Sequence, residues 1–247
     1  RLCRFAYSLT VDNNQQHYRV MEIGYATFSE VGRRFENQDV LKVIQMPQAD
    51  RALMVVCDGM GGHEMGDVAA QVVSKSLCEY WLDNPSMPDS EQKIIEACEV
   101  ASRRLYARAN TPYRFIEMGT TMVMASIEGN MVTIAHCGDS RCYLLRGNEV
   151  IHQTTDHADC IPQSERVLKC FFSLDPDVSQ PEVIRFEVQK GDRLFLCSDG
   201  VNKYVAPQIL TDLLQDDLPL EQILDGVSFL CLKNSMDNYT GILAEIL

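Results

Sequence analysis

Four aspartates in this 247-residue chain stand where an apolar run typical of a buried strand meets a loop, each beside Gly or Asn. They are Asp58, Asp139, Asp199 and Asp237. If the strands ending at the first three and the strand beginning at the fourth are antiparallel neighbours, all four carboxylates meet at one edge of the sheets. Gathered carboxylates need compensating charge, and Mg²⁺ and Mn²⁺ prefer oxygen ligands. The pattern leaves two interpretations open, a two-ion metal site and a set of ordinary Asp-Gly turns.

A glycine-rich loop, DGMGGH from Asp58 to His63, opens directly onto a predicted helix. Its three glycines permit close backbone approach, and such a loop at a helix N-terminus can cradle a phosphate group. The loop lacks the Lys-Ser/Thr pair of a P-loop and the spacing of a dinucleotide-binding fingerprint, so both of those motifs are excluded.

A polar run, GRRFENQD over residues 32–39, comes just before another predicted strand. An arginine in this run could grip a phosphate dianion through paired N–H donors. The alternative is a solvated, charged turn without a ligand.

The composition limits the partners. Lys and Arg total 22 against 35 Asp and Glu, a net charge of −13, which argues against binding to nucleic acid or acidic lipid unless cations intervene. The ten cysteines are scattered, lack a CxxC pair and lie partly in apolar runs, as reduced cytosolic thiols do. Because no apolar stretch reaches the roughly 18 residues of a bilayer span and no secretory leader is evident, we expect a cytoplasmic protein.

The elements that would position these residues are predicted from periodicity and turn signals. Strands are expected over residues 5–11, 18–28, 40–44, 52–57, 120–127, 132–137, 142–146, 149–152, 183–188, 193–197 and 240–246. Helices are expected over residues 65–81, 90–110, 207–214 and 220–232, the second with Asp89 as its N-cap. The turns at 129–130, 147–148 and 190–192 predict three hairpins, and residues 156–181 a loop with a short helix or strand inside it.

This order of elements does not follow the alternating βαβ pattern of a parallel sheet. Strands in hairpins, with helices in two pairs, favour an α/β (α+β) fold, an α-β-β-α sandwich of two antiparallel sheets flanked by helix pairs. No repeat, low-complexity tract or linker divides the sequence, so we expect residues 1–247 to form a single domain.

The same segments, taken together, resemble the metal-dependent Ser/Thr protein phosphatases of type 2C (the PPM family), especially their compact bacterial form. The matching pieces occur in the family's order: RFENQD (34–39), VCDGMGGH (56–63), GTT (119–121), GDSR (138–141), TTDH (154–157), CSDG (197–200) and DNYT (237–240). Single pieces are weak signals, whereas seven in order are specific. The resemblance covers the chain from about residue 22 onward and implies an α-β-β-α sandwich with metals at one edge.

The resemblance also implies a set of metal ligands. By matching position, Asp58 would bridge two Mg²⁺ or Mn²⁺ ions, and the backbone carbonyl of Gly59 would help to bind the second. Asp199 and Asp237 would complete the first site. Asp139, with Asp199, would form the third, weaker site seen in bacterial members.

The implied activity is hydrolysis of phosphoserine and phosphothreonine in proteins. Arg34 matches the arginine that binds the substrate phosphate, and Asp39 matches the carboxylate that orients metal-bound water, so the implied catalytic residues are Arg34, Asp39 and Asp58. The family reaction is direct attack on phosphorus by a metal-bridging hydroxide, without a phosphoenzyme. The resemblance implies a monomer that acts on phosphoprotein substrates and opposes a Ser/Thr kinase.

Two other functions stay open: a weakly active or inactive phosphatase-like domain that binds phosphoproteins or regulates a partner, and a metal phosphohydrolase for small molecules. The chain also departs from the family pattern. Met60 and Gly61 occupy the region where some relatives carry a histidine proposed as general acid, and His63 lies further on. Residues 159–177 are shorter than the usual flap. These departures leave open the identity of the general acid, the basis of substrate selection and the occupancy of the third metal site.

Overall fold

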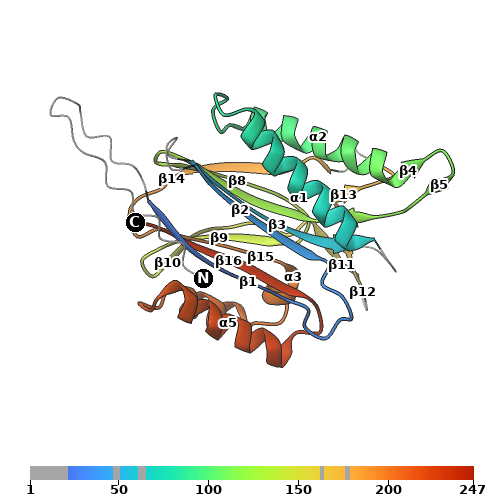
Figure 1. Cartoon of the computed structure of the whole chain (residues 1–247). Helices are drawn as coiled ribbons and strands as arrows, with labels where there is room; N and C mark the ends of the chain where they lie inside the picture. Colours follow the sequence, from blue (N-terminus) through green and yellow to red (C-terminus); the bar gives the residue numbers. More distant parts are fainter. Residues whose placement is uncertain (1–21, 47–50, 61–64, 162–163, 176–178) are drawn as a thin grey trace.

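The fold is known from a computed structural model that describes residues 22–46, 51–60, 65–161, 164–175 and 179–247 (Figure 1). Four sequence expectations lie wholly or partly outside these ranges: the strand over 5–11, the first part of the strand over 18–28, the phosphate-cradling role of the glycine-rich loop over 58–63, and any role of His63. None of the described helices is long and apolar enough to cross a bilayer.

Two large antiparallel sheets face each other at the centre of the molecule (Figure 1). The seven-stranded sheet contains β13 (Phe171–Phe172), β6 (Gly119–Thr120), β3 (Arg51–Met60), β7 (Met122–Glu128), β8 (Met131–Cys137) and β14 (Glu182–Glu187) in that order, with β2 (Asp39–Met46) paired to β3. The five-stranded sheet has the order β1 (Ile23–Glu30), β16 (Tyr239–Ile246), β15 (Arg193–Cys197), β9 (Arg141–Arg146) and β10 (Glu149–Gln153). Apolar side chains from both sheets, such as Val56 and Ile242, form one buried cluster between them.

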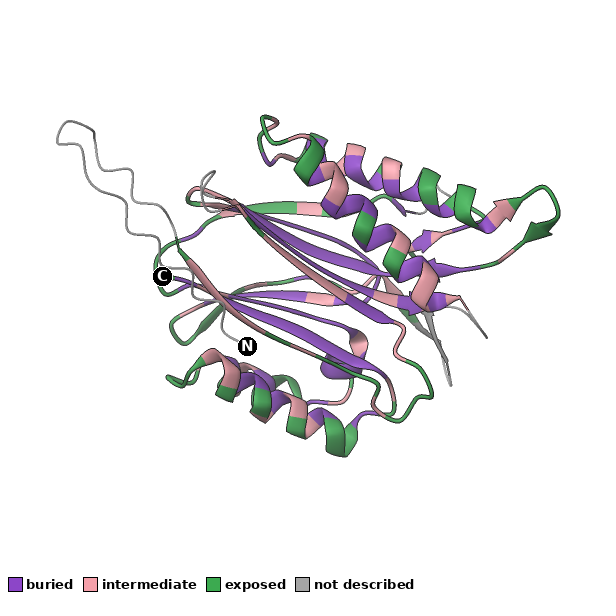
Figure 2. Cartoon of the chain, viewed as in Figure 1, coloured by how far each residue is buried: buried purple, intermediate pink, exposed green. Residues whose placement is uncertain are grey.

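A layer of helices covers the outer face of each sheet. The long helices α1 (Gly66–Asp83) and α2 (Glu91–Ala109) pack on the seven-stranded sheet, and their inward faces are buried while the outward faces are exposed (Figure 2). The short α3 (Asp199–Asn202), α4 (Pro207–Leu214) and α5 (Leu220–Asn234) pack on the five-stranded sheet. The predicted α-β-β-α sandwich is confirmed.

Two of the three predicted hairpins form. Gly129 connects β7 to β8 and Gly147 connects β9 to β10, with φ of 55° and 54°, the left-handed conformation that such turns need. The third prediction, a hairpin of residues 183–188 with 193–197, is wrong. β14 pairs with β8, whereas both edges of β15 are already paired, with β9 and β16. The segment between them carries the chain from one sheet to the other.

The helix α2 begins one residue later than predicted. Its N-cap is Ser90, whose Oγ accepts a hydrogen bond from the backbone N–H of Lys93. Asp89, the predicted cap, is instead buried and accepts hydrogen bonds from Lys93 Nζ at 2.9 Å and Trp81 Nε1 at 3.2 Å. The buried ammonium group of Lys93 needs a buried carboxylate as its partner. Asp89 fills that role and therefore does not cap the helix.

Residues 156–181 contain short strands, as predicted. β11 (Ala158–Ile161) pairs with β12 (Ser164–Val167) in a separate hairpin, and β13 joins the seven-stranded sheet next to β6. A further two-stranded ribbon, β4 (Asn110–Thr111) with β5 (Arg114–Phe115), follows α2. The cysteines that the structure describes, outside β11, are free thiols, and most of them are buried.

Candidate active site

Strand direction brings the four sequence-predicted aspartates to one edge of the sandwich. In the seven-stranded sheet, β3 and β8 both pair antiparallel with β7, so they run in the same direction, and Asp58 and Asp139 lie at the same end. In the five-stranded sheet, β15 ends two residues before Asp199, and the antiparallel β16 begins two residues after Asp237. Each sheet therefore contributes two carboxylates, and the pairs face each other where the sheets meet.

Asp58 does not sit in a turn. β3 continues through it to Met60, and Asp58 lies directly opposite Asp39 of β2 in the strand register. The turn interpretation of Asp58-Gly59 is therefore wrong. Gly59 is required for close packing, because a Cβ there would lie 2.2 Å from the backbone oxygen of Gly66 at the start of α1.

Burial and the neighbouring carboxylates raise the pKa values of these carboxyls. Burial raises the pKa of Asp39 to about 7, although a 2.7 Å hydrogen bond from Ser198 Oγ opposes the shift. Burial also raises the pKa of Asp58 well above its ordinary value, and the charges of Asp39 and Asp199 raise it further. The pKa of Asp139 is raised by burial and then by Asp199. The cluster therefore carries more negative charge than its protein surroundings compensate.

This donor set suits hard divalent cations. Mg²⁺ and Mn²⁺ bind carboxylate and carbonyl oxygens, and a cation among these aspartates would remove the repulsion that raises their pKa values. A further polar atom lacks a partner here: Oδ1 of Asn202 is buried and makes no hydrogen bond to the described part of the protein, while its Nδ2 donates to the backbone oxygen of Asp139 at 3.0 Å. Buried acceptors of this kind are usually satisfied by ordered water.

Two basic side chains contact the aspartates. Arg34 donates from one guanidinium nitrogen to Asp237 Oδ2 at 2.6 Å and is 59% exposed. Lys203 Nζ donates to Asp139 Oδ2 and to Asp199 Oδ2, each at 2.8 Å. The sequence analysis missed Lys203, which lies outside every quoted motif. Its position four residues after Asp199 is the signal that could have revealed its contact with that aspartate.

Asn238 holds the segment that carries Arg34 and Asp39 against the start of β16. Its Oδ1 accepts a hydrogen bond from the backbone N–H of Gln38 at 3.0 Å. Its Nδ2 donates to the backbone oxygens of Val31 and Glu36, both at 2.8 Å. The sequence analysis quoted Asn238 within a motif without assigning it this role. One side chain thus positions the residues beside the clustered aspartates.

A second cluster of possible ligands has the wrong geometry for an ion. His136, His157 and Glu182 are the group in the described chain whose ligating atoms all lie within 4.8 Å of one another. The two imidazoles are stacked, with centroids 4.3 Å apart and planes at 11°, so their lone pairs lie in two nearly parallel planes and do not converge on one point. His136 Nε2 is also engaged with the Thr155 carbonyl at 2.7 Å. In a two-ion centre the ligands are divided between ions about 3.5–4 Å apart. The ligating oxygens of the aspartates therefore need not all lie within the 4.8 Å that limits the His136, His157 and Glu182 group.

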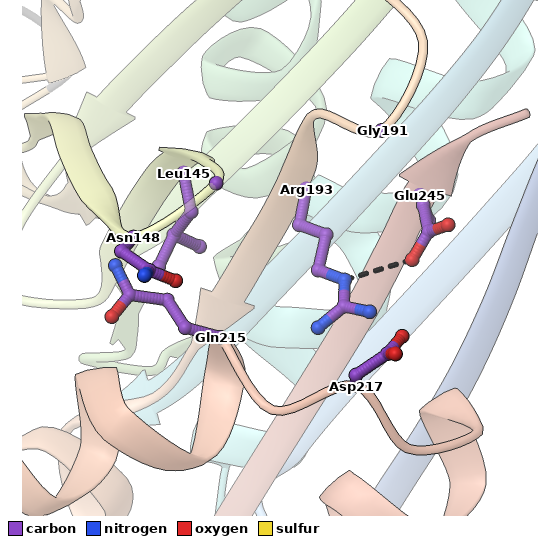
Figure 3. A pocket seen from close by; sticks show the side chains of 8 residues that line it. Leu145, Asn148, Gly191, Arg193, Gln215, Asp217 and Glu245 are labelled. Atoms are coloured by element: carbon purple, nitrogen blue, oxygen red, sulfur yellow. Dashed lines mark hydrogen bonds and ion pairs between the residues drawn. The ribbon is translucent and has the colours of Figure 1, made fainter.

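A surface pocket lies at the other end of the five-stranded sheet (Figure 3). Arg193 lines it and donates to Glu245 at 2.8 Å and to the backbone oxygens of Leu214 and Asp216. Arg193 opens β15 and Asp199 follows its end, so the strand alone separates them by at least about 13 Å. This pocket is not part of the aspartate cluster.

Comparisons with known proteins identify the family of the chain. The family model described as Protein phosphatase 2C matches residues 29–242, which include every residue of the cluster. The chain belongs to the protein phosphatase 2C family.

Similar proteins include bacterial phosphatases at less than 30% identity. The protein phosphatase PhpP of Streptococcus pneumoniae is 28% identical, with 92% of this chain and 98% of that protein covered. A crystal structure of the serine/threonine phosphatase PstP/Ppp of Mycobacterium tuberculosis is 28% identical with a TM-score of 0.79, covering 90% of this chain and 98% of that one. The catalytic domain of PstP in complex with two manganese ions is 28% identical with a TM-score of 0.76, covering 92% and 99%.

Proposed function

We propose that this chain is a protein Ser/Thr phosphatase that hydrolyses phosphoserine and phosphothreonine and requires two Mg²⁺ or Mn²⁺ ions. The observation that carries the proposal is the cluster of buried aspartates at one edge of the sandwich, with pKa values raised by burial and by one another. Family membership and the manganese complex of a similar catalytic domain support it.

Asp58, the backbone oxygen of Gly59, Asp199 and Asp237 would hold the two ions. When bound, such ions lower the pKa of water toward neutrality and neutralise phosphoryl oxygens, which is the chemistry that hydrolysis of a phosphate ester needs. The remaining steps depend on residues of the chain. Asp39, fixed by Ser198 and lying opposite Asp58, orients the attacking water.

Arg34 is suited to binding the substrate phosphate. It is exposed at the rim of the cluster, and its bond to Asp237 uses one of five N–H donors, so two can form the paired contact that a phosphate dianion accepts. Positive charge at this point offsets the charge that the phosphoryl oxygens carry during displacement.

We extend the proposal to the whole chain. Residues 1–247 form one phosphatase domain that acts as a monomer in the cytoplasm and removes phosphate groups added by a Ser/Thr kinase. The acidic composition, with a net charge of −13, supports protein substrates over nucleic acid.

The test is phosphate release from a phosphothreonine peptide in the presence of Mn²⁺. We expect turnover that EDTA abolishes and that falls at least about 100-fold in Asp58→Asn and Asp199→Asn, as is typical when an electrostatic group at the reaction centre is lost. Asp225→Asn, an exposed carboxylate on α5, is the matched control and should keep full activity. A folded protein that binds Mn²⁺ but releases no phosphate would contradict the proposal, and higher activity on phosphorylated metabolites would redirect it to small molecules.

A further inference from the structure

Lys203 places a positive charge between two of the predicted metal ligands. Its Nζ lies 2.8 Å from Asp139 Oδ2 and 2.8 Å from Asp199 Oδ2. These are the two aspartates to which the family resemblance assigns a third, weaker metal site. An ammonium group that bridges both carboxylates occupies the position a divalent ion would need, since that ion would have to approach the same oxygens at about 2.0–2.1 Å.

The surrounding backbone fixes this arrangement. The backbone N–H of Lys203 donates to the backbone oxygen of Asp199 at 3.0 Å, which closes the short helix α3 and places the lysine one turn beyond that aspartate. The neighbouring Asn202 donates to the backbone oxygen of Asp139 at 3.0 Å, which ties α3 to the end of the seven-stranded sheet. Lys203 is therefore held to both strands whose carboxylates it bridges.

Burial makes the contact strong. The side chain of Asp139 is 3% exposed and that of Lys203 is 26% exposed, so solvent screens the pair far less than a surface ion pair. Burial and Asp199 raise the pKa of Asp139, while the ammonium of Lys203 opposes that rise. A divalent ion entering here would have to displace a charge already in contact with both ligands.

We propose that the ammonium of Lys203 takes the place of the third metal ion, so that this chain binds two divalent ions at most. The inference rests on the proposed function, because it assumes the two-ion site formed by Asp58, Asp199 and Asp237. It makes Lys203 a positioning residue that fixes Asp139 and Asp199, and removing it should open the third site.

The experiment counts bound Mn²⁺ in the full chain by equilibrium dialysis with metal analysis, supported by calorimetric titration. We expect two ions for the native protein and three for Lys203→Met, which removes the charge and keeps the length of the side chain. Lys203→Arg keeps the charge and should bind two. Lys190→Met, an exposed lysine at the far end of β15, is the matched control and should also bind two. Lys203→Gln provides a second neutral variant if Lys203→Met folds poorly.

The outcomes separate this inference from the proposed function. Three ions in the native protein, or two in both Lys203→Met and Lys203→Gln, would overturn the role of Lys203 and leave the phosphatase proposal intact. Fewer than two ions in the native protein would overturn the proposed function and the inference together. A crystal of the native protein soaked in Mn²⁺ gives an independent answer: an anomalous peak that contacts both Asp139 and Asp199 would contradict the inference even if no variant folds.

Discussion

At the scale of single residues, buried carboxyls and two basic side chains determine the charge of the site. Asp39, Asp58 and Asp139 are carboxyls whose pKa values burial raises, and only two basic side chains are seen to contact the cluster in the described chain. Those two differ in exposure. Lys203 is largely enclosed and bridges two aspartates, whereas Arg34 is mostly exposed and contacts one. The enclosed charge is suited to holding ligands in place, and the exposed one to meeting a substrate.

Arg34→Ala should lower kcat/KM for a phosphothreonine peptide by about 10- to 100-fold, because a hydrogen bond to a charged group contributes about 1.5–3 kcal/mol. Initial rates over a range of peptide concentrations check the prediction, and thermal unfolding should change little because the side chain is mostly exposed. Arg33→Ala is the control: that neighbour contacts Met236 Sδ and the Lys233 carbonyl and should keep its activity. Equal losses in both variants would show that Arg34 has no special contact with phosphate.

At the scale of helices and strands, periodicity and turn signals predicted most of the fold. The errors arose where a strand pairs with segments that are distant in the chain. The Gly-Asn turns fixed two hairpins because a two-residue turn determines its own partner strands. The Lys-Gly-Asp turn at 190–192 also predicted a hairpin, yet β15 is a central strand whose partners β9 and β16 are distant in the chain. Lys203 was missed for a similar reason, since Asp139 reaches it only after the two sheets pack together.

The close approach of α3 to the start of β16 gives an element-scale prediction. A Cβ on Gly200 would lie 1.8 Å from the backbone oxygen of Asn238, so Gly200→Ala must push apart the segments that carry Asp199 and Asp237. We expect a loss of about 1–3 kcal/mol in the free energy of unfolding, measured by urea denaturation, together with weaker Mn²⁺ binding.

Gly226→Ala is the matched control for Gly200→Ala, because its nearest neighbour, a Leu213 methyl carbon, is 3.7 Å away and the residue lies within α5. It should be neutral or slightly stabilising, since alanine favours helix by about 1 kcal/mol over glycine. If Gly200→Ala bound Mn²⁺ as tightly as the native protein, the spacing of these two segments would not control the site.

The stacked histidines at the end of β8 predict a pH dependence. Burial lowers the pKa of His136 and of His157 below 6.5, and the charge of the His157 imidazole lowers the pKa of His136 further. Below pH 6.5 the unfolded chain therefore binds more protons than the folded one, so these groups destabilise the fold as the pH falls through 6.5 toward their folded pKa values.

Urea denaturation of the native protein and of His136→Gln between pH 7.5 and 5.5 checks this dependence. The native free energy of unfolding should fall relative to the variant by at most about 1.4 kcal/mol per pH unit, the value for one proton. Comparing the two proteins cancels the contribution of Asp39, whose pKa of about 7 acts in the opposite direction. Parallel pH curves for the two proteins would contradict the assignment to His136.

At the scale of the whole molecule, the edge that carries the aspartates is divided between two sheets. Asp58 lies in β3 and Asp139 follows β8 of the seven-stranded sheet, and Asp199 and Asp237 flank strands of the five-stranded sheet. The apolar layer between the sheets holds them together, while the like charges at the edge push them apart. Bound cations would replace this repulsion between carboxylates with attraction to the ions. Metal binding should therefore stabilise the folded sandwich.

Thermal unfolding with Mn²⁺ and with EDTA measures this linkage. At about 100 times its Kd, an ion that binds only the folded state adds about 2.7 kcal/mol. For a chain of this size each kcal/mol raises Tm by about 2–4 °C, so each bound Mn²⁺ ion should raise the native Tm by roughly 5–10 °C.

Asp58→Asn separates repulsion from ligation within this linkage. The neutral amide keeps the shape of the side chain and removes the charge that Asp39 and Asp199 oppose, so in EDTA the variant should melt at a higher temperature than the native protein. The same change removes the carboxylate proposed to bridge the two ions, so the Mn²⁺-induced rise should be largely lost, whereas Asp225→Asn should match the native protein in both conditions. A lower Tm for Asp58→Asn in EDTA would show that the carboxylate is not under electrostatic strain. If Mn²⁺ raised the Tm of that variant as much as that of the native protein, the ions would bind elsewhere. Contacts within the protein alone would then hold the two sheets together at this edge.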